Sequence, residues 1–148
     1  MKKYYFYIAA AMVVMGCEAG SQDSQLPAQH EIEQVSTLEF TDLKELYNAQ
    51  VSNAQVLIQG EIIALLPDDN EGSRHQKFIV KLASGQTVLI VHNIDLAPRI
   101  NSIEKGEQVL VYGEYEYNDK GGLIHWTHDD PQNRHEHGYI EYQGLKYQ

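Results

Sequence analysis

The sequence predicts a mainly β protein: a small five-stranded, OB-like barrel with one short N-terminal helix and a C-terminal hairpin. From residue 54 onward, apolar and polar residues alternate with the period of two that is typical of strands. Gly60 lies inside the first of these runs, and such a glycine often marks a bulge or a sharp bend. An irregular stretch at 93–105, which contains Pro98, separates the third run from the fourth. Together these observations favour the OB-like barrel, and a β-sandwich of short strands is the alternative.

The first predicted element of the folded domain is a short helix over 41–49. Thr41 is suited to cap it, and Asp42 suits the positive N-terminal end of the helix dipole. The apolar residues Leu43, Leu46 and Tyr47 fall on one face.

Five strands are then predicted, separated by turn-forming residues. The loop at 67–73 is polar, and the turns at 83–86 and 118–122 contain glycine. A small terminal hairpin is expected over 139–147, around Gln143-Gly144. The strands are expected at 55–66, 75–82, 87–92, 107–117 and 123–128.

The N-terminal residues indicate a secretory signal. Lys2 and Lys3 precede an apolar run over 4–16, and the chain's single cysteine, Cys17, follows it. Val14-Met15-Gly16-Cys17 resembles the lipobox of bacterial lipoproteins, in which the cysteine is lipidated and becomes the new N-terminus. The alternatives are a transmembrane anchor, for which the run is shorter than the roughly 20 residues needed, and an ordinary signal peptide, whose small-x-small ending is missing.

This interpretation divides the chain into three parts. Residues 1–16 are the predicted lipoprotein signal peptide, 17–35 a flexible polar tether, and 36–148 a single folded domain. We therefore expect the protein at the bacterial cell envelope, held to a membrane through lipidated Cys17. Glu18 follows the cysteine, which by enterobacterial sorting rules permits a periplasm-facing place on the outer membrane.

The charge of the chain disfavours nucleic acid as a partner. Loss of Lys2 and Lys3 with the signal peptide moves the formal charge from −10 to −12. Binding to nucleic acid depends on Lys and Arg side chains that neutralise phosphates, so no nucleic-acid partner is expected.

The candidate chemistry lies in histidines near the ends of strands. In an OB-type barrel, the start of the second strand and the ends of the third and fifth share one pole, which brings His75, His92 and His128 together. Two further histidines and an aspartate lie close to the fifth strand in the sequence. The candidate metal or ligand residues are therefore His75, His92, His125, His128, His135 and Asp130.

Side-chain alternation assigns directions to the fifth strand. Trp126 and His128 are expected to point inward with Ile124, and His125 and Thr127 outward. Trp126 is then either a core anchor, the reading favoured by this alternation, or a rim residue that stacks on a sugar or a base.

Tyr115 on the fourth strand is a second candidate for such stacking, and tyrosine is also simply a good strand residue.

Three functions are consistent with these residues. The first is a non-catalytic module that binds a small molecule, a glycan or a protein. The second is a metal-dependent hydrolase, and the third is a metal-binding protein without turnover; imidazole ligands suit Zn, Cu or Ni. Alternatively, the histidines form a solvated or hydrogen-bonded network, or His128 and Asp130 act as an acid–base pair without metal. The acidic charge, the small size and the lack of a known catalytic motif favour the first function.

The C-terminal residues carry a family resemblance. His125-Trp126-Thr127-His128, Asp130-Pro131 and His135, with Gly113-Glu114-Tyr115 and Lys120-Gly121-Gly122 before them and 144–148 after, resemble a family of small bacterial proteins known as a domain of unknown function. The resemblance covers about the last two-thirds of the chain. It implies that the family pattern includes His92, His125, His128, Asp130 and His135, and it assigns them no roles.

Overall fold

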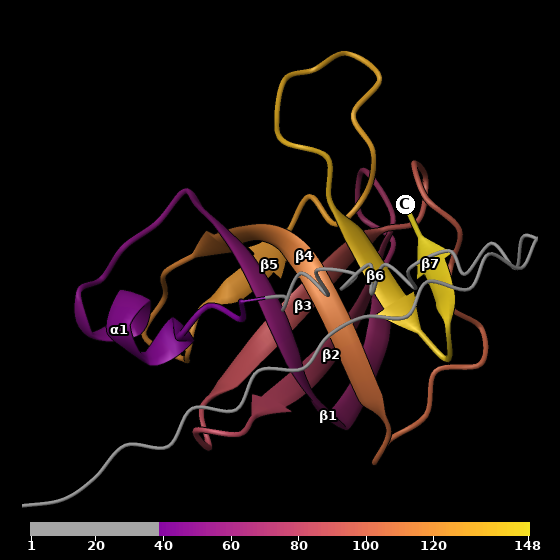
Figure 1. Ribbon diagram of the computed structural model, residues 1–148. Coiled ribbons are helices and arrows are strands. Elements are labelled where there is room, and N and C mark those ends of the chain that lie inside the picture. The colour runs from indigo at the N-terminus through magenta and orange to yellow at the C-terminus, as the bar shows by residue number, and fades with distance from the viewer. Residues whose placement is uncertain (1–38) are drawn as a thin grey trace, which may run out of the picture. The chain divides into compact units, whose positions relative to one another are not determined.

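One short helix and seven strands make up the part of the chain that the computed structural model describes, residues 39–148 (Figure 1). The predictions for the signal peptide, Cys17 and most of the tether lie outside these residues. Within them, no helix has the length and apolar character needed to cross a membrane. The elements are α1 Leu43–Asn48, β1 Ala54–Asp69, β2 His75–Leu82, β3 Thr87–Asn93, β4 Gln108–Glu116, β5 Leu123–His125, β6 Tyr139–Tyr142 and β7 Leu145–Tyr147.

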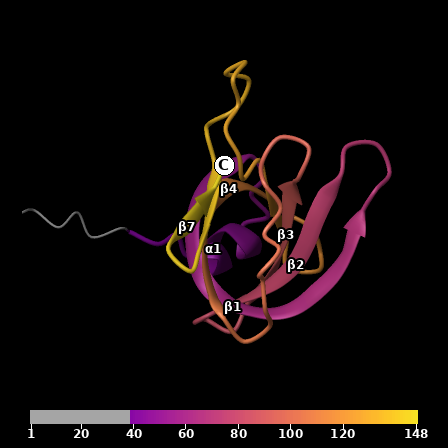
Figure 2. The same ribbon diagram turned by 90° about the vertical axis from the view of Figure 1, so that its right-hand side faces the viewer.

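Five strands close into a ring because β1 pairs along both of its edges. The first half of β1 pairs antiparallel with β4, and the second half pairs antiparallel with β2. At the changeover, Gly60 and Glu61 have partners on both sides. The order β1-β2-β3-β5-β4 completes the ring, and β6 and β7 extend the sheet from β4 (Figures 1 and 2). The predicted mainly β, OB-like arrangement with a short helix and a terminal hairpin is confirmed.

The strand pairing brings three strand ends to one pole of the ring. β3 and β5 are parallel, with Leu89 opposite Leu123 and Ile90 opposite Ile124, so both strands run toward the same pole. The first residue of β2, His75, lies opposite the last residue of β3, Asn93. The start of β2 and the ends of β3 and β5 therefore lie at one pole, as the sequence predicts.

Apolar side chains from every strand of the ring fill its interior. Burial alternates strictly along β3 and β4, as expected for strands with one face toward a core. Leu43 of α1 and Ile140 of β6 are also fully buried. The largest of the fully buried apolar side chains are Tyr115, Tyr142, Phe78, Leu43, Ile58, Ile62, Ile90, Ile100, Ile124 and Ile140.

The helix begins two residues later than predicted, and its cap is Asp42, whose side chain accepts a hydrogen bond from the N–H of Lys44 at 2.9 Å. Thr41 is instead bound to β1. Its N–H donates to the carbonyl of Leu57 at 2.8 Å, and its hydroxyl accepts from the N–H of Leu57 at 3.1 Å. Thr41 therefore ties the start of the domain to the ring.

The first strand is longer than predicted and continues to Asp69. Two register shifts, between Ile62 and Ala64 and between Leu66 and Asp69, allow it to keep its pairing with β2. Pro67, which lacks an N–H, falls in the second of these irregular segments, where no ladder hydrogen bond is required of it.

Gly60 generates the first prediction, because it lies where β1 changes partner. A Cβ atom at this position would come within 2.5 Å of the carbonyl oxygen of Lys81 and 2.6 Å of Val80 Cγ1. Gly60→Ala is therefore expected to lower the free energy of unfolding by about 1–3 kcal/mol, measured by urea denaturation.

Gly72→Ala is the matched control. Gly72 has a φ of 72° but no neighbour within 4 Å of a Cβ, so only backbone strain of about 1 kcal/mol applies. A Gly60→Ala protein as stable as the parent would show that the close approach at the changeover is not required.

Candidate functional site

The fifth strand ends at His125, because Trp126 adopts the left-handed backbone conformation, with a φ of 48°. This conformation breaks the side-chain alternation expected over 123–128. Trp126 is 37% exposed, whereas Thr127 is fully buried. The prediction that Trp126 points inward and Thr127 outward is therefore wrong, although Ile124 and His128 are buried as expected.

The contact that holds Trp126 in this conformation comes from the other end of the β5–β6 connection, residues 126–138, which projects from the ring in Figure 1. Gly138 lies directly against the carbonyl of Trp126 and the Cα of Thr127, and a Cβ at this glycine would overlap both. The N–H of Gly138 donates to the carbonyl of His128 at 3.0 Å. The two ends of the connection are thus packed together at its base.

Trp126 is the centre of a triple stack, which we define as His125, Trp126 and His135. Its indole lies 4.7 Å from the ring of His125 and 4.6 Å from that of His135, with interplanar angles of 8° and 12°. Two imidazoles therefore stack on the indole, which also lines the pocket described below. Tyr115, the other candidate for stacking, is fully buried in the core.

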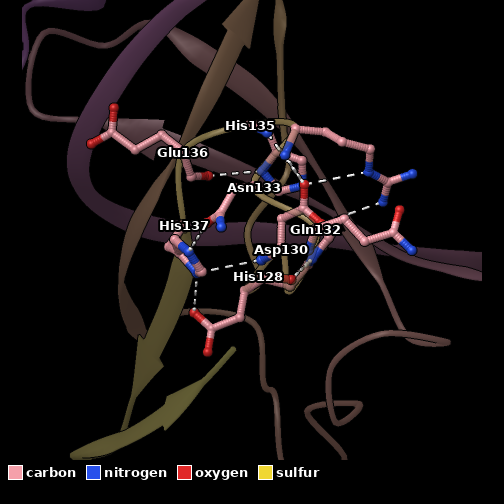
Figure 3. A network of polar contacts seen from close by, with 9 residues as sticks. His128, Asp130, Gln132, Asn133, His135, Glu136 and His137 are labelled. Carbon is pink, nitrogen blue, oxygen red and sulfur yellow. Dashed lines mark hydrogen bonds and ion pairs between the residues drawn. The ribbon is translucent and has the colours of Figure 1, made fainter.

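Asp130 organises the connection from inside (Figure 3). Its carboxylate is 1% exposed and accepts backbone hydrogen bonds from Gln132 at 3.0 Å, from Arg134, and from His135 at 3.3 Å. Burial alone acts to raise the pKa of Asp130, but the backbone N–H groups of Arg134 and Gln132 hold it well below its usual range. The oxygens of Asp130 are thus occupied in shaping the loop.

His92 has partners at both ring nitrogens. Its Nδ1 lies 2.8 Å from the hydroxyl of Thr127, and its Nε2 lies 3.2 Å from the carbonyl of Pro98. A carbonyl only accepts, so Nε2 donates to Pro98 and Nδ1 accepts from Thr127. Burial lowers the pKa of His92 to about 4, so the ring is neutral at pH 7. His92 therefore fastens the end of β3 to the residues after β5, with no ring nitrogen free for a ligand.

The other predicted histidines line a pocket of about 350 Å³ at this pole. No carboxylate contributes to the lining of the pocket, although the chain as a whole is acidic. The lining residues are Ser73, His75, Val91, Asn93, Leu96, His125, Trp126, His128, Arg134 and His135. The structure thus brings together His75, His125, His128 and His135 and leaves His92 and Asp130 outside the lining.

A second group lies on the outer face of β4 and β5. One ligand atom from each of Glu114, Glu116 and His125 falls within 4.8 Å of the others, the spacing of a group that could hold a metal ion. Across residues 39–148, no group that contains His92 or His128 meets this criterion. The expected convergence of His92 and His128 on one metal is therefore not found in this part of the chain.

Glu114 is the central member of a cross-strand row, which we define as Gln55 of β1, Glu114 of β4 and His125 of β5. Gln55 Nε2 and His125 Nε2 are the only two buried side-chain atoms of the described residues that lack a hydrogen-bond partner. Gln55 and His125 thus flank Glu114 in the sheet, and His125 Nε2 is 3.7 Å from Glu114 Oε1.

The charges of this group are poorly compensated. Burial raises the pKa of Glu114, and the neighbouring charge of Glu116 raises it further. Burial lowers the pKa of His125, against the opposing effect of Glu116. The group therefore contains two carboxylates that repel each other and a neutral imidazole.

Glu114 and Glu116 were not predicted as site residues. The sequence feature that could have identified them is the alternation along the fourth strand, which places Tyr115 inward and both glutamates outward. Their closeness to His125 depends on the register of β4 against β5, and periodicity does not determine that register.

Comparison with known proteins gives a family match. The sequence profile of a family described as "Protein of unknown function (DUF3465)" matches residues 30–148. No curated protein matches the chain.

His92 generates a prediction for pH dependence. Its pKa of about 4 in the folded protein lies below the usual 6.5, so between these values only the unfolded chain takes up the proton. Its contribution to stability is therefore complete above pH 6.5 and is lost as the pH falls toward 4, by about 3 kcal/mol at most. Urea unfolding across this range should show a shallower pH dependence for His92→Gln than for the parent.

Other buried histidines, such as His128, contribute a loss of the same sign in both proteins, so the difference between the two curves isolates His92. Identical curves would show that His92 is not neutral in the folded protein.

Proposed function

The chain belongs to the DUF3465 family, and we propose that it is a transition-metal-binding module held at the bacterial cell envelope by a lipid on Cys17. The observation that carries this proposal is the group formed by Glu114, Glu116 and His125, with its ligand atoms within 4.8 Å of one another. The orphaned His125 Nε2 in the cross-strand row supports it, because buried polar groups without partners are rare in folded proteins.

A cation at this group relieves its unfavourable electrostatics. Glu114 is only 16% exposed and carries its charge beside that of Glu116. A metal ion bound between them replaces this repulsion with attraction and gives the orphaned His125 Nε2 a partner. Bonds of about 2.0–2.2 Å require the three ligand atoms to lie about 3.5 Å apart. That is a shift of about 1 Å, within the reach of glutamate side-chain rotation.

The donor set indicates the class of metal. The single cysteine of the chain is the proposed lipidation site, so the folded domain offers nitrogen and oxygen ligands without thiolate. One imidazole with two carboxylates suits Zn, and Cu or Ni are also compatible with imidazole ligands. The acidic mature chain attracts cations to the domain in general.

The proposed location rests on the lipobox-like Val14-Met15-Gly16-Cys17 and on the polar residues that follow it. A tether over 17–35 gives the folded domain reach from the membrane surface. Metal ions that enter the envelope are then available to the site, and cytoplasmic nucleic acid is not.

Metal-dependent hydrolysis is the second candidate function. Three protein ligands leave a coordination position open, which is the arrangement of catalytic zinc sites, where the metal lowers the pKa of a bound water. The histidine-lined pocket shares His125 with this group and offers space for a substrate. Metal-dependent cleavage of simple ester or phosphoester probes, lost in Glu114→Gln, is the result that would favour catalysis.

Removal of the carboxylates tests the metal site. The full-length protein is purified in detergent without an oligohistidine tag, and Zn²⁺ binding is followed by calorimetry and elemental analysis. Glu114→Gln/Glu116→Gln is expected to weaken binding at this site by about 100-fold or more, because two of three ligands lose their charge. Glu141→Gln, which changes an exposed carboxylate on β6, should bind as the parent does.

A parent protein that takes up no Zn, Cu or Ni would overturn the proposal. So would a double variant that binds with the affinity of the parent. Near-UV circular dichroism verifies that the variants keep their tertiary packing.

Substitution of Cys17 tests the anchor. Cells that express the protein are labelled with a fatty acid, and the label is expected on the parent and on the control Ser21→Ala. It should be absent from Cys17→Ala, which has no thiol to acylate. Equal labelling of Cys17→Ala and the parent would contradict lipidation at this residue.

A further inference from the structure

Two buried imidazoles, those of His128 and His135, lie together in the lining of the pocket. His128 is 3% exposed and the side chain of His135 is 4% exposed, and both line the pocket. Their rings meet edge to face, with centroids 5.1 Å apart. The Nε2 atom of neither ring makes a hydrogen bond to the described residues.

The opposite nitrogens of these rings determine what the Nε2 atoms offer. His128 Nδ1 lies 2.7 Å from the carbonyl of Asp129, and His135 Nδ1 lies 2.8 Å from the carbonyl of Glu136. A carbonyl only accepts, so both Nδ1 atoms carry the proton, and each neutral ring has a lone pair on Nε2. An imidazole whose second nitrogen donates to a backbone carbonyl has the orientation that metal-ligating histidines almost always have.

The carboxylate of Asp130 lies near one of these nitrogens. His135 Nε2 lies 3.9 Å from Asp130 Oδ2, which is too long for a hydrogen bond. That carboxylate is filled by the backbone N–H groups of the loop. Burial also lowers the pKa of His128, which favours the neutral ring. The pocket lining therefore offers imidazole lone pairs, and its one charged side chain, Arg134, is paired with the carboxylate of Asp130 at 3.4 Å.

We propose that His128 and His135 form a second transition-metal site, inside the pocket and separate from the group of Glu114, Glu116 and His125. His75 lines the same pocket, but its ring nitrogens do not come within 4.8 Å of those of both His128 and His135, so the site has two protein ligands. An all-imidazole donor set without carboxylate favours Cu or Zn, and Cu binds most tightly in the divalent series. Asp130 is a positioning residue for this site, since it holds the backbone of His135 in place.

The two sites are joined by the triple stack. His125 belongs to the outer group and His135 to the pocket, and the indole of Trp126 holds both rings within 5 Å of its own centre. The second site does not depend on the first, because it uses neither Glu114 nor Glu116 and its evidence comes from different atoms.

The experiment counts sites in the full-length protein, purified in detergent without an oligohistidine tag. Titration with Cu²⁺, followed by elemental analysis and electron paramagnetic resonance, is expected to show two bound ions per chain, one of them with two histidine nitrogen ligands. His135→Phe keeps an aromatic ring against Trp126 but removes the ligand nitrogen. It should weaken binding of the nitrogen-rich ion by about 100-fold or more and leave the other ion in place.

His137→Gln is the matched control, because His137 is an exposed histidine of the same loop, bound to Asp129 and Asn133. It should bind both ions as the parent does. Thermal unfolding identifies a variant that has lost its fold, and His128→Gln then serves as an independent removal of the second ligand.

The two proposals fail in different ways. One ion lost only in Glu114→Gln/Glu116→Gln would overturn the pocket site and leave the outer group standing. One ion lost only in His135→Phe and His128→Gln would overturn the outer group and support the pocket site. Cu²⁺ affinity within twofold of the parent in both histidine variants would also overturn the pocket site.

Discussion

The double pairing of β1 is the constraint on which the rest of the structure depends. β1 pairs with both β4 and β2. It changes partner at Gly60, where the backbone of β2 leaves no room for a side chain. The ring closes only with this change of partner, and closure brings β5 in beside β3 in parallel. Parallel pairing places the ends of these strands at one pole. The histidine-lined pocket is therefore a consequence of ring closure, although its residues are far apart in the sequence.

At that pole, a single backbone conformation decides what the side chains do. The left-handed φ of Trp126 ends β5 and turns Thr127 inward, where its hydroxyl fastens His92. The same conformation turns the indole outward, where two imidazoles stack on it. Such a conformation is costly for a bulky residue, and the packing of Gly138 against it and the stacking of the rings stabilise it. The conformation of this one residue thus determines both the structural contact of His92 and the positions of the stacked imidazoles of His125 and His135.

The sequence predicted the features that depend on local pattern. Alternation identified all five strands of the ring, and the Gln143-Gly144 pair, with φ values of 51° and 76°, forms the expected hairpin turn. The end of β5 could not be predicted, because the conformation of Trp126 depends on a contact with Gly138, across the loop. Glu114 and Glu116 were missed as site residues for a related reason. Their proximity to His125 arises from strand register, a property of two segments together rather than of either one.

Burial links the stability of this pole to its chemistry. Removing imidazoles from water lowers the pKa of His92, His125 and His128, so protons compete weakly for their nitrogens near neutral pH. A neutral histidine with both ring nitrogens hydrogen-bonded, such as His92, links two segments of the fold. A histidine with one nitrogen paired to a carbonyl retains a lone pair that a metal ion can use, because metals bind only the unprotonated nitrogen. In a folded domain without cysteine, the same burial that makes the pole sensitive to acid thus prepares its remaining imidazoles for metal.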